Sequence, residues 1–300
     1  MNTQKLISVV IPSYKRLDTV VRAVNSVLNQ SYKDLEVLVV DDNIPGDEFS
    51  IQLKTIVESI NDKRVRLVTQ SRHVNGAKAR NVGIENAKGE YVAFLDDDDE
   101  WLPLKLERQL AFLMENPNLK GCSVLYNEYK DDVLVHSCPP YTADNLFQKI
   151  FRREVAIFTS TVLLNRQCLI DSGMFDVNLK RHQDLQMLLR FTNKFDMGVI
   201  PEYFVKLHLD SGINRPNADA IVNVKENFFN SVSDLYDRCS IKEKRLILSA
   251  HCYEIMFAAL KQKRYVMALS YFYKAGFSLS GYKLLSKRFR DRKYIANSKL

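Results

Sequence analysis

The sequence predicts an α/β protein with a mostly parallel sheet flanked by helices and a helical appendix at the C-terminal end. Over the first hundred residues, short β-branched runs alternate with helical patterns, which is typical of βαβ units. Beyond residue 217 only helical patterns remain, rich in Tyr, Phe, Lys and Arg. The 300 residues, 46% hydrophobic and 26% charged, are enough for a sizeable core and have the composition of an ordinary globular protein.

Each expected strand of the first half is a short apolar run that ends at a turn signal. These strands cover residues 7–12, 35–40, 65–68 and 91–95. The helices between them are expected at residues 18–30, 50–60 and 76–87. The second half is mixed, and we expect a helix at 104–115, a hairpin from strands at 121–129 and 133–136, a strand at 158–164, a helix at 182–195 and an extended segment at 197–208.

Four consecutive aspartates, Asp96 to Asp99, follow directly after the apolar run of residues 91–95. Like charges this close raise each other's pKa unless a cation or donor groups lie between them. A divalent cation held by one or two carboxylates, with phosphate oxygens at its other positions, is the usual solution. A solvated acidic turn before a helix is the alternative. Because the run abuts a strand, the sequence favours a metal site.

Two more polar groups follow expected strands, and ligands of parallel α/β sheets bind at such carboxyl ends. Tyr14 and Arg16 follow the first strand, and Asp42 follows the second. Tyr14 can stack on a base, and Asp42 can accept a hydrogen bond from a ring N–H. A half-buried loop aromatic and a helix or turn cap are the alternatives for these two residues.

The helix expected at residues 76–87 begins with a glycine and two cations. Asn75 precedes it, Gly76 opens it, and Lys78 and Arg80 lie in its first turn. A helix N-terminus with two cations suits an anion such as a diphosphate. A packing glycine on a solvated helix is the alternative.

Four segments resemble the signature blocks of glycosyltransferase family 2, in that family's order and at its usual spacing. They are residues 8–14 (SVVIPSY), 40–43 (VDDN), 79–84 (ARNVGI) and 94–101 (FLDDDDEW). The resemblance implies the Rossmann-like GT-A fold and a nucleotide-sugar donor, most often UDP-linked. It also implies inversion of the anomeric centre and a divalent metal, Mn²⁺ or Mg²⁺.

Carried over by position, the resemblance makes Pro12, Tyr14 and Asp42 the base-binding edge, with Arg16 close by. Residues 96–98 match the DXD motif, so Asp98 would hold the metal through the diphosphate and Asp96 or Asp97 would contact the ribose. Many members have a small residue where Asp97 stands, which leaves the division of labour between these two aspartates open. Asp96 is also a candidate metal ligand. Asp99 and Trp101 match too, and we expect them to be structural.

His208 resembles a histidine that some members place near the metal, and a surface or core imidazole is the alternative. Residues 173–176 (GMFD) and 182–185 (HQDL) resemble a later block of the family, with Gln183 in place of the usual Glu. Asp184 falls where the family keeps its general base. Such a base is needed because an acceptor hydroxyl is a poor nucleophile until its proton is removed. The alternative is that Asp184 only favours the first turn of its helix.

The basic character of the chain lies in its tail. The net charge is +7, but residues 261–300 hold eleven basic residues and one acidic residue, so the first 260 carry about −3. A cationic helical tail indicates an anionic membrane surface as partner. RNA binding, or a solvated helical bundle, would fit the same composition.

Several absences bear on location. No segment approaches the roughly 18 uninterrupted apolar residues that a membrane-spanning helix needs, and residues 1–5 do not lead into a signal peptide. The five cysteines are scattered and include no C-x-x-C pair, which favours reduced thiols in the cytosol. We therefore expect a cytoplasmic protein, peripheral on the inner face of the cell membrane.

These observations and the resemblance predict an inverting, metal-dependent glycosyltransferase of surface polysaccharide biosynthesis (O-antigen, capsule or lipopolysaccharide), acting on a glycan or lipid-linked acceptor. Its first domain would cover residues 1–215, with a nucleotide-binding half (1–101) and an acceptor-binding half (102–215), and a basic helical region would cover 216–300. A sugar nucleotidyltransferase is the enzyme alternative, but it would show a Gly-rich loop where residues 12–16 read PSYKR. The second alternative is a non-catalytic protein that binds nucleic acid or another anionic surface. Nucleic-acid binding leaves the acidic run unexplained, so we expect no nucleic-acid partner.

Overall fold

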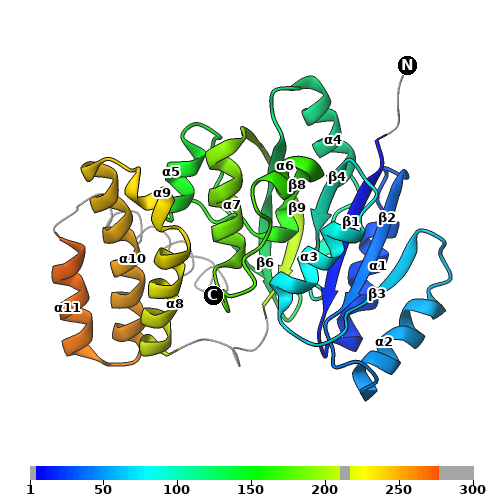
Figure 1. The fold of residues 1–300 in the computed structure, drawn as a ribbon, viewed down its shortest axis with the longest axis horizontal. Helices are drawn as coiled ribbons and strands as arrows, with labels where there is room; N and C mark the ends of the chain where they lie inside the picture. Colours follow the sequence, from blue (N-terminus) through cyan, green and yellow to red (C-terminus); the bar gives the residue numbers. More distant parts are fainter. Residues whose placement is uncertain (1–4, 210–216, 277–300) are drawn as a thin grey trace.

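The computed structural model describes residues 5–209 and 217–276, and within them nine strands form one sheet (Figure 1). Neighbouring strands follow the order β3-β2-β1-β4-β8-β6-β9-β5, with β7 paired to β6. The first four strands are parallel to one another. They are β1 (Ile7–Ser13), β2 (Leu35–Asp41), β3 (Val65–Thr69) and β4 (Tyr91–Phe94). The predicted α/β class is therefore confirmed.

Three helices connect the parallel strands. They are α1 (Leu17–Leu28), α2 (Glu48–Ser59) and α3 (Gly76–Asn86), each within two residues of its predicted bounds. The amphipathic face of α1, which includes Val20, Val24 and Val27, is buried against the sheet. Asp47 and Asn75 cap the N-termini of α2 and α3 with their side chains, which satisfies N–H groups that have no partner within the helix.

Helix α3 lies unusually close to β1 because Gly83 has no side chain. A Cβ atom built on Gly83 would lie 2.2 Å from a methyl carbon of Val10, far inside van der Waals contact. The close approach of Gly83 to Val10 sets the distance between α3 and the sheet. It therefore also sets the position of the N-terminus of α3 beside the strand ends.

The second half adds strands of both directions. β8 (Val162–Asn165) is antiparallel to β4 and to β6 (Gly121–Lys130), whereas β9 (Met197–His208) is parallel to β6. The hairpin of β6 with β7 (Val133–Ser137) is as predicted, and the two-residue β5 (Glu100–Trp101) pairs with β9.

The prediction of one strand over residues 158–164 is wrong in its first part. A short 3₁₀ turn covers Thr159–Thr161, and β8 begins only at Val162. The Thr161 hydroxyl donates a 2.7 Å hydrogen bond to the carbonyl of Phe158, and such local bonds compete with a strand ladder. This turn places its hydroxyl groups beside the end of β4.

Four helices accompany the second half. They are α4 (Lys105–Glu115), α5 (Leu146–Phe151), α6 (Arg166–Asp171) and α7 (Gln183–Lys194). α4 and α7 were predicted. α5 and α6 were not, because six residues are too few to display a helical period.

The described residues beyond 217 are helical, as predicted. They form α8 (Ala218–Ser231), α9 (Ser233–Asp237), α10 (Ile241–Lys261) and α11 (Tyr265–Ala275), with α8 beside α7 and α11 outermost (Figure 1). Phe228 and Ile247 belong to the same apolar cluster as Phe151 of α5 and Leu188 of α7. The helices therefore share a core with the α/β part, and the domain boundary near residue 215 stays a prediction. None of the described helices is long and apolar enough to span a bilayer.

Candidate active site

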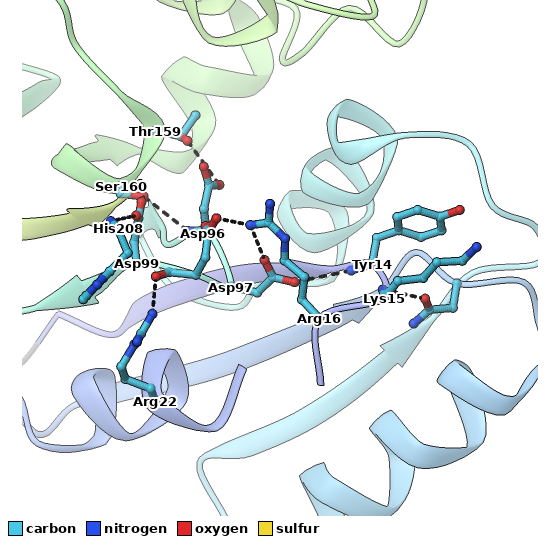
Figure 2. A network of polar contacts seen from close by, with 12 residues as sticks. Tyr14, Lys15, Arg16, Arg22, Asp96, Asp97, Asp99, Thr159, Ser160 and His208 are labelled. Atoms are coloured by element: carbon cyan, nitrogen blue, oxygen red, sulfur yellow. Dashed lines mark hydrogen bonds and ion pairs between the residues drawn. The ribbon is translucent and has the colours of Figure 1, made fainter. Parts of the chain in front are cut away.

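The acidic run lies where the order of the parallel strands reverses. β1 is flanked by β2 on one side and by β4 on the other, so the segments that leave β1 and β4 border the crevice in which ligands of such sheets bind. Tyr14, Lys15 and Arg16 come from β1, and Asp96 to Asp99 come from β4. Figure 2 shows the two segments in contact.

Asp97 is the buried member of the run, with 6% of its surface exposed. Its carboxylate accepts a hydrogen bond from the backbone N–H of Tyr14 (3.4 Å), and its other oxygen lies 3.6 Å from Nη1 of Arg16. Burial raises the pKa of the Asp97 carboxyl to about 6, against the opposing effect of Arg16. This aspartate therefore ties the two loops together beneath the crevice.

Asp96 and Asp98 are more exposed, and each is paired with an arginine. The Arg16 guanidinium contacts the Asp98 carboxylate, and the Arg80 guanidinium contacts that of Asp96. The side chain of Arg22 also donates a 2.6 Å hydrogen bond to the backbone carbonyl of Asp98. Two arginines thus offset the charges of Asp96 and Asp98, and a third binds the backbone of the acidic loop.

Asp99 is a structural member of the run, as predicted. It accepts hydrogen bonds from the Ser160 hydroxyl (2.6 Å) and from the backbone N–H of His208 (3.3 Å). Burial, together with Asp96 and Asp97, raises the pKa of the Asp99 carboxyl well above its usual range. The Trp101 indole donates to the Ser160 carbonyl at 2.8 Å. These bonds tie the acidic loop to the 3₁₀ turn and to the end of β9.

His208 lies at the margin of this cluster. Its Nε2 atom is 3.7 Å from a carboxylate oxygen of Glu100 and makes no hydrogen bond within the described part of the chain. Burial, and then the Arg22 charge, lower the pKa of the imidazole. A neutral imidazole with an unused ring nitrogen fits the role of a metal ligand, although the contacts of His208 lead to Glu100 rather than to Asp96 or Asp98.

The metal site predicted from the sequence has carboxylate donors but no complete ligand set of its own among the described residues. Among residues 5–209 and 217–276, no three His, Cys, Asp or Glu side chains are grouped so as to hold a metal ion by themselves. Asp96 and Asp98 supply carboxylate oxygens, which suit Mg²⁺ or Mn²⁺ when phosphate oxygens complete the coordination. The residues fit a cation that arrives with a phosphorylated ligand.

Two residues that the sequence did not single out, His73 and Gln70, lie at the predicted base-binding edge. The Tyr14 ring stacks on the His73 ring, with centroids 4.3 Å apart and planes 16° from parallel. Asp42 is buried and accepts hydrogen bonds from the Gln70 amide (2.9 Å) and the Val74 N–H (3.3 Å). Burial raises the pKa of the Asp42 carboxyl. Both residues follow β3, whose carboxyl end lies at the same edge of the sheet. Their position after a strand end is the sequence feature that could have identified them as candidate site residues.

Pro12 lies inside β1, paired with Val40 of β2. It is thus part of the strand from which the Tyr14 loop leaves the sheet. At the start of α3, the Asn75 side chain caps the helix and donates a 2.8 Å hydrogen bond to the Val177 carbonyl. A Cβ atom on Gly76 would lie 3.0 Å from Nη1 of Arg80, so the glycine leaves room for that arginine to reach Asp96. Lys78 follows in the same turn and is half-buried.

Asp184 lies in the first turn of α7 and is half-buried. Burial raises the pKa of its carboxyl, while the N–H of Leu185 and the charges of Arg153 and Arg80 lower it, and Asp96 raises it. Asp184 is therefore an electrostatic neighbour of Asp96, a member of the acidic run, and of Arg80, the partner of Asp96. This holds although 85 or more residues separate Asp184 from the run in the sequence. The sequence did not single out Arg153 as a neighbour of Asp184.

Carboxylates paired with arginines and a stacked aromatic thus lie together at the carboxyl ends of β1, β2 and β4. The family model for Glycosyl transferase family 2 matches residues 8–169. The chain belongs to glycosyl transferase family 2, as its four sequence blocks indicated.

Relatives of known name agree with this. The amylovoran biosynthesis glycosyltransferase AmsB of Erwinia amylovora is 31% identical over 191 residues, which cover 61% of this chain and 62% of AmsB. WfaP of Escherichia coli, a UDP-Glc:α-D-GlcNAc-diphosphoundecaprenol β-1,3-glucosyltransferase, is 34% identical over 164 residues, which cover 54% of this chain and 61% of WfaP. The chain also matches uncharacterized glycosyltransferases of Rickettsia felis and Rickettsia conorii, of which it spans about a third.

A solved structure confirms the fold. The mannosyltransferase PcManGT of Pyrobaculum calidifontis, in complex with GDP-Man and Mn²⁺, superposes with a TM-score of 0.61 at 14% identity. The match covers 98% of this chain and 84% of PcManGT. At this identity the likeness shows the GT-A fold alone.

Proposed function

We propose that the protein is an inverting glycosyltransferase that moves a sugar from a nucleotide-sugar donor, with UDP as the first choice, to a hydroxyl of a glycan or lipid-linked acceptor. The observation that carries this proposal is the pairing of Asp96 and Asp98 with Arg80 and Arg16 in the crevice, with Asp184 near the same charges. The name of WfaP, with its UDP-linked donor and diphosphoundecaprenol-linked acceptor, supports both substrate classes. Amylovoran biosynthesis, in the name of AmsB, supports a role in surface polysaccharide synthesis.

The donor would lie along the carboxyl ends of β1, β2 and β4. The Tyr14 ring stacks on the base on the side where His73 now lies, and Asp42 accepts a ring N–H in place of the Gln70 amide. The diphosphate then meets Arg16, Arg80, Lys78 and the N-terminus of α3, which all favour negative charge. Asp96 or Asp97 contacts the ribose.

Asp98, with Asp96, would hold Mn²⁺ or Mg²⁺ together with the diphosphate, and His208 is the third candidate ligand. Held there, such a cation would neutralise charge on the leaving nucleoside diphosphate. Arg16 and Arg80 also neutralise charge on the leaving diphosphate. Its oxygens compete with the Asp98 and Asp96 carboxylates for the guanidinium groups of these two arginines.

Asp184 acts as the general base. Its ionised carboxylate takes the proton of the acceptor hydroxyl while that oxygen attacks the anomeric carbon, on the face opposite the leaving diphosphate. The new C–O bond forms as the bond to the diphosphate breaks, which inverts the configuration. Because burial raises the pKa of the Asp184 carboxyl, the residue is a stronger base than a solvated aspartate.

The apolar side of α11 supports the proposal of a peripheral membrane location. Val266, Leu269 and Tyr273 lie on one face and are 86%, 57% and 75% exposed, and Lys263 and Lys274 flank them in sequence. Apolar side chains between cations suit the surface of an anionic bilayer. The basic cluster of residues 283–293 lies outside the described residues.

The test is a thermal-shift screen of UDP, GDP and TDP, each with and without Mn²⁺, followed by a transfer assay with the matching sugar nucleotides. We expect one nucleotide to raise the unfolding temperature by several degrees, and more with Mn²⁺ than without. The nucleotide selected should identify the donor in the transfer assay. If no nucleoside diphosphate stabilises the protein under either condition, the proposal is wrong.

A further inference from the structure

Two asparagines of α3 are hydrogen-bonded to residues 173–182, the segment that leads into Asp184 at the start of α7. Asn81 lies in the middle of α3 and is 7% exposed. Its Nδ2 atom donates a 2.8 Å hydrogen bond to the Phe175 carbonyl, and its Oδ1 atom accepts a 3.0 Å bond from the Phe175 N–H. One buried side chain thus satisfies both backbone polar groups of Phe175.

Asn75 makes the second connection, from the N-cap position of α3. Its Oδ1 atom accepts the N–H of Lys78 at 3.0 Å, and its Nδ2 atom donates a 2.8 Å hydrogen bond to the Val177 carbonyl. Capping the helix needs only the oxygen, so the amide nitrogen is available for the segment. A serine at this position keeps a capping oxygen but has no amide nitrogen to reach Val177.

The ring of Phe175 lies against residues of the candidate active site. It packs edge-on against Phe94, the last residue of β4, with ring centroids 5.3 Å apart. The Arg80 guanidinium lies 5.6 Å from the centroid of the same ring and also contacts the Asp96 carboxylate. Phe175 is therefore in contact both with the strand that precedes the acidic run and with an arginine that pairs with that run.

The end of the segment also lies beside α3. The Nε2 atom of Gln183, next to Asp184 in the chain, donates a 2.6 Å hydrogen bond to the Leu179 carbonyl. Its Oε1 atom lies 4.0 Å from the position that a Cβ atom on Gly76 would take. The first turn of α7 and the N-terminus of α3 are therefore close neighbours.

Helix α3 thus contacts both sides of the proposed reaction. Its N-terminus, with Lys78 and Arg80, is where the donor diphosphate would bind, and its two asparagines hold the segment that leads to the base. A ligand that makes a helix more rigid also orders the groups that are bonded to it. Attack on the anomeric carbon depends on where the base lies, because a shift of about 1 Å can lower the rate about 10²-fold.

We propose that Asn75 and Asn81 are positioning residues, through which a diphosphate bound at the N-terminus of α3 orders residues 173–182 and so places Asp184 for catalysis. Donor binding and placement of the base are then coupled through one helix. The inference rests on the proposed function for the diphosphate ligand and for the assignment of Asp184 as the base.

The test is hydrogen–deuterium exchange, measured by mass spectrometry with and without UDP, GDP or TDP and Mn²⁺. In the wild type, the nucleotide that binds should slow exchange at the crevice loops (residues 14–16 and 96–99). It should also slow exchange at residues 173–182, at least about threefold. In Asn81→Ala and in Asn75→Ser the crevice loops should still be protected by the nucleotide, whereas residues 173–182 should not.

Asn86→Ala is the matched control. Asn86 is the last residue of the same helix, and its side chain donates a 2.9 Å hydrogen bond to the Val82 carbonyl one turn earlier. This variant should show the wild-type pattern of exchange. Because Asn75→Ser keeps a capping oxygen, it should be as stable to urea as the wild type, and it decides by itself if Asn81→Ala does not fold.

Transfer kinetics give a second readout. Asn81→Ala and Asn75→Ser should lower kcat at least about tenfold with little change in the KM for the donor, because the donor site itself is intact. Asn86→Ala should leave both constants unchanged. A contribution to stability alone would lower the resistance to urea without this selective loss of kcat.

The outcomes separate the inference from the proposed function. If a nucleotide protects the crevice loops of the wild type but not residues 173–182, only the inference is overturned. The same holds if residues 173–182 are protected equally in the wild type and in both asparagine variants, or if these variants keep the wild-type kcat. If no nucleotide slows exchange at the crevice loops, the proposed function fails and the inference fails with it.

Discussion

The four aspartates of the candidate site lie in three kinds of environment, and we expect the environment to divide the work among them. Asp97 is buried and bonded to the backbone of Tyr14, so it shapes the loop. Asp96 and Asp98 are partly exposed and paired with arginines, so an incoming diphosphate can exchange partners with them. Asp184 is held apart on α7, where burial makes it basic.

Replacing the base tests the assignment of Asp184. Asp184→Asn should lower the transfer rate by about 10²–10⁴-fold, the usual contribution of a general base, and leave the Kd for the donor nearly unchanged. Transfer assays and calorimetry of donor binding measure the two effects, with Asp171→Asn, an exposed aspartate at the end of α6, as control. Turnover at the wild-type rate would show that Asp184 is not the base.

A second residue-scale prediction concerns Lys105, which is buried under the acidic loop. Its ammonium lies 3.8 Å from the centroid of the Trp101 ring and 2.8 Å from the Gln109 amide oxygen. Burial lowers the pKa of Lys105 from 10.5 to about 7. Between these two values the unfolded chain binds more protons at this site than the folded protein, so the free energy of unfolding rises with pH.

Lys105→Met should remove this pH dependence. From pH 7 to pH 9 the free energy of unfolding of the wild type should rise by about 2 kcal/mol more than that of the variant. Urea unfolding at both pH values measures the difference, with Lys33→Met, at an exposed lysine, as control. Parallel pH dependences in wild type and Lys105→Met would contradict the argument.

At the scale of elements, the site depends on how closely α3 packs on β1. Gly83→Ala places a Cβ atom 2.2 Å from a methyl carbon of Val10 and should cost about 1–3 kcal/mol of stability through overpacking. Urea unfolding measures the loss. The double variant Gly83→Ala/Val10→Ala should recover part of it, since it removes the clashing methyl groups. A single variant as stable as the wild type would show that α3 shifts without cost.

The regular elements of the first half were predictable because each has its own local signal. β1 to β4 are short apolar runs, and α1 shows a complete amphipathic period. The sequence did not predict α5, α6 or the 3₁₀ turn at Thr159–Thr161. The two helices are too short, at six residues each, to show a helical period. In the turn, hydroxyl hydrogen bonds override the β-branched composition that favours a strand.

The candidate site divides in the same way. Tyr14, Asp42 and Asp96 to Asp98 could be found because strand ends and family blocks mark them. His73, Gln70 and Arg153 lie in segments without a motif. The charge of Arg153 acts on Asp184 across the packing of α5 against α7, which is a tertiary contact.

At the scale of the whole molecule, the C-terminal helices connect the α/β sheet to an exposed apolar face. α11 packs on α10 through Ala268 and Tyr253, while its opposite face, with Val266 and Leu269, is open to solvent. Single substitutions on that face therefore disturb the fold less than deletion of the helix.

The membrane proposal predicts that Val266→Asp and Leu269→Asp together weaken binding to vesicles that contain phosphatidylglycerol, at least tenfold. The variant buries less apolar surface and adds two charges that an anionic bilayer repels. Vesicle sedimentation measures binding. Ile241→Asp, an exposed apolar position at the start of α10, is the control and should bind like the wild type. Equal sedimentation of all three proteins would rule out docking through α11.

The central claim is that the crevice between β1 and β4 binds a nucleoside diphosphate together with a divalent cation. Calorimetric titration of UDP, GDP and TDP into the wild type and into Asp98→Asn, each with and without Mn²⁺, tests it most directly. We expect Mn²⁺ to tighten UDP binding at least tenfold in the wild type and to have little effect in Asp98→Asn. Binding of UDP, GDP and TDP that is the same with and without Mn²⁺ in both proteins would contradict the claim.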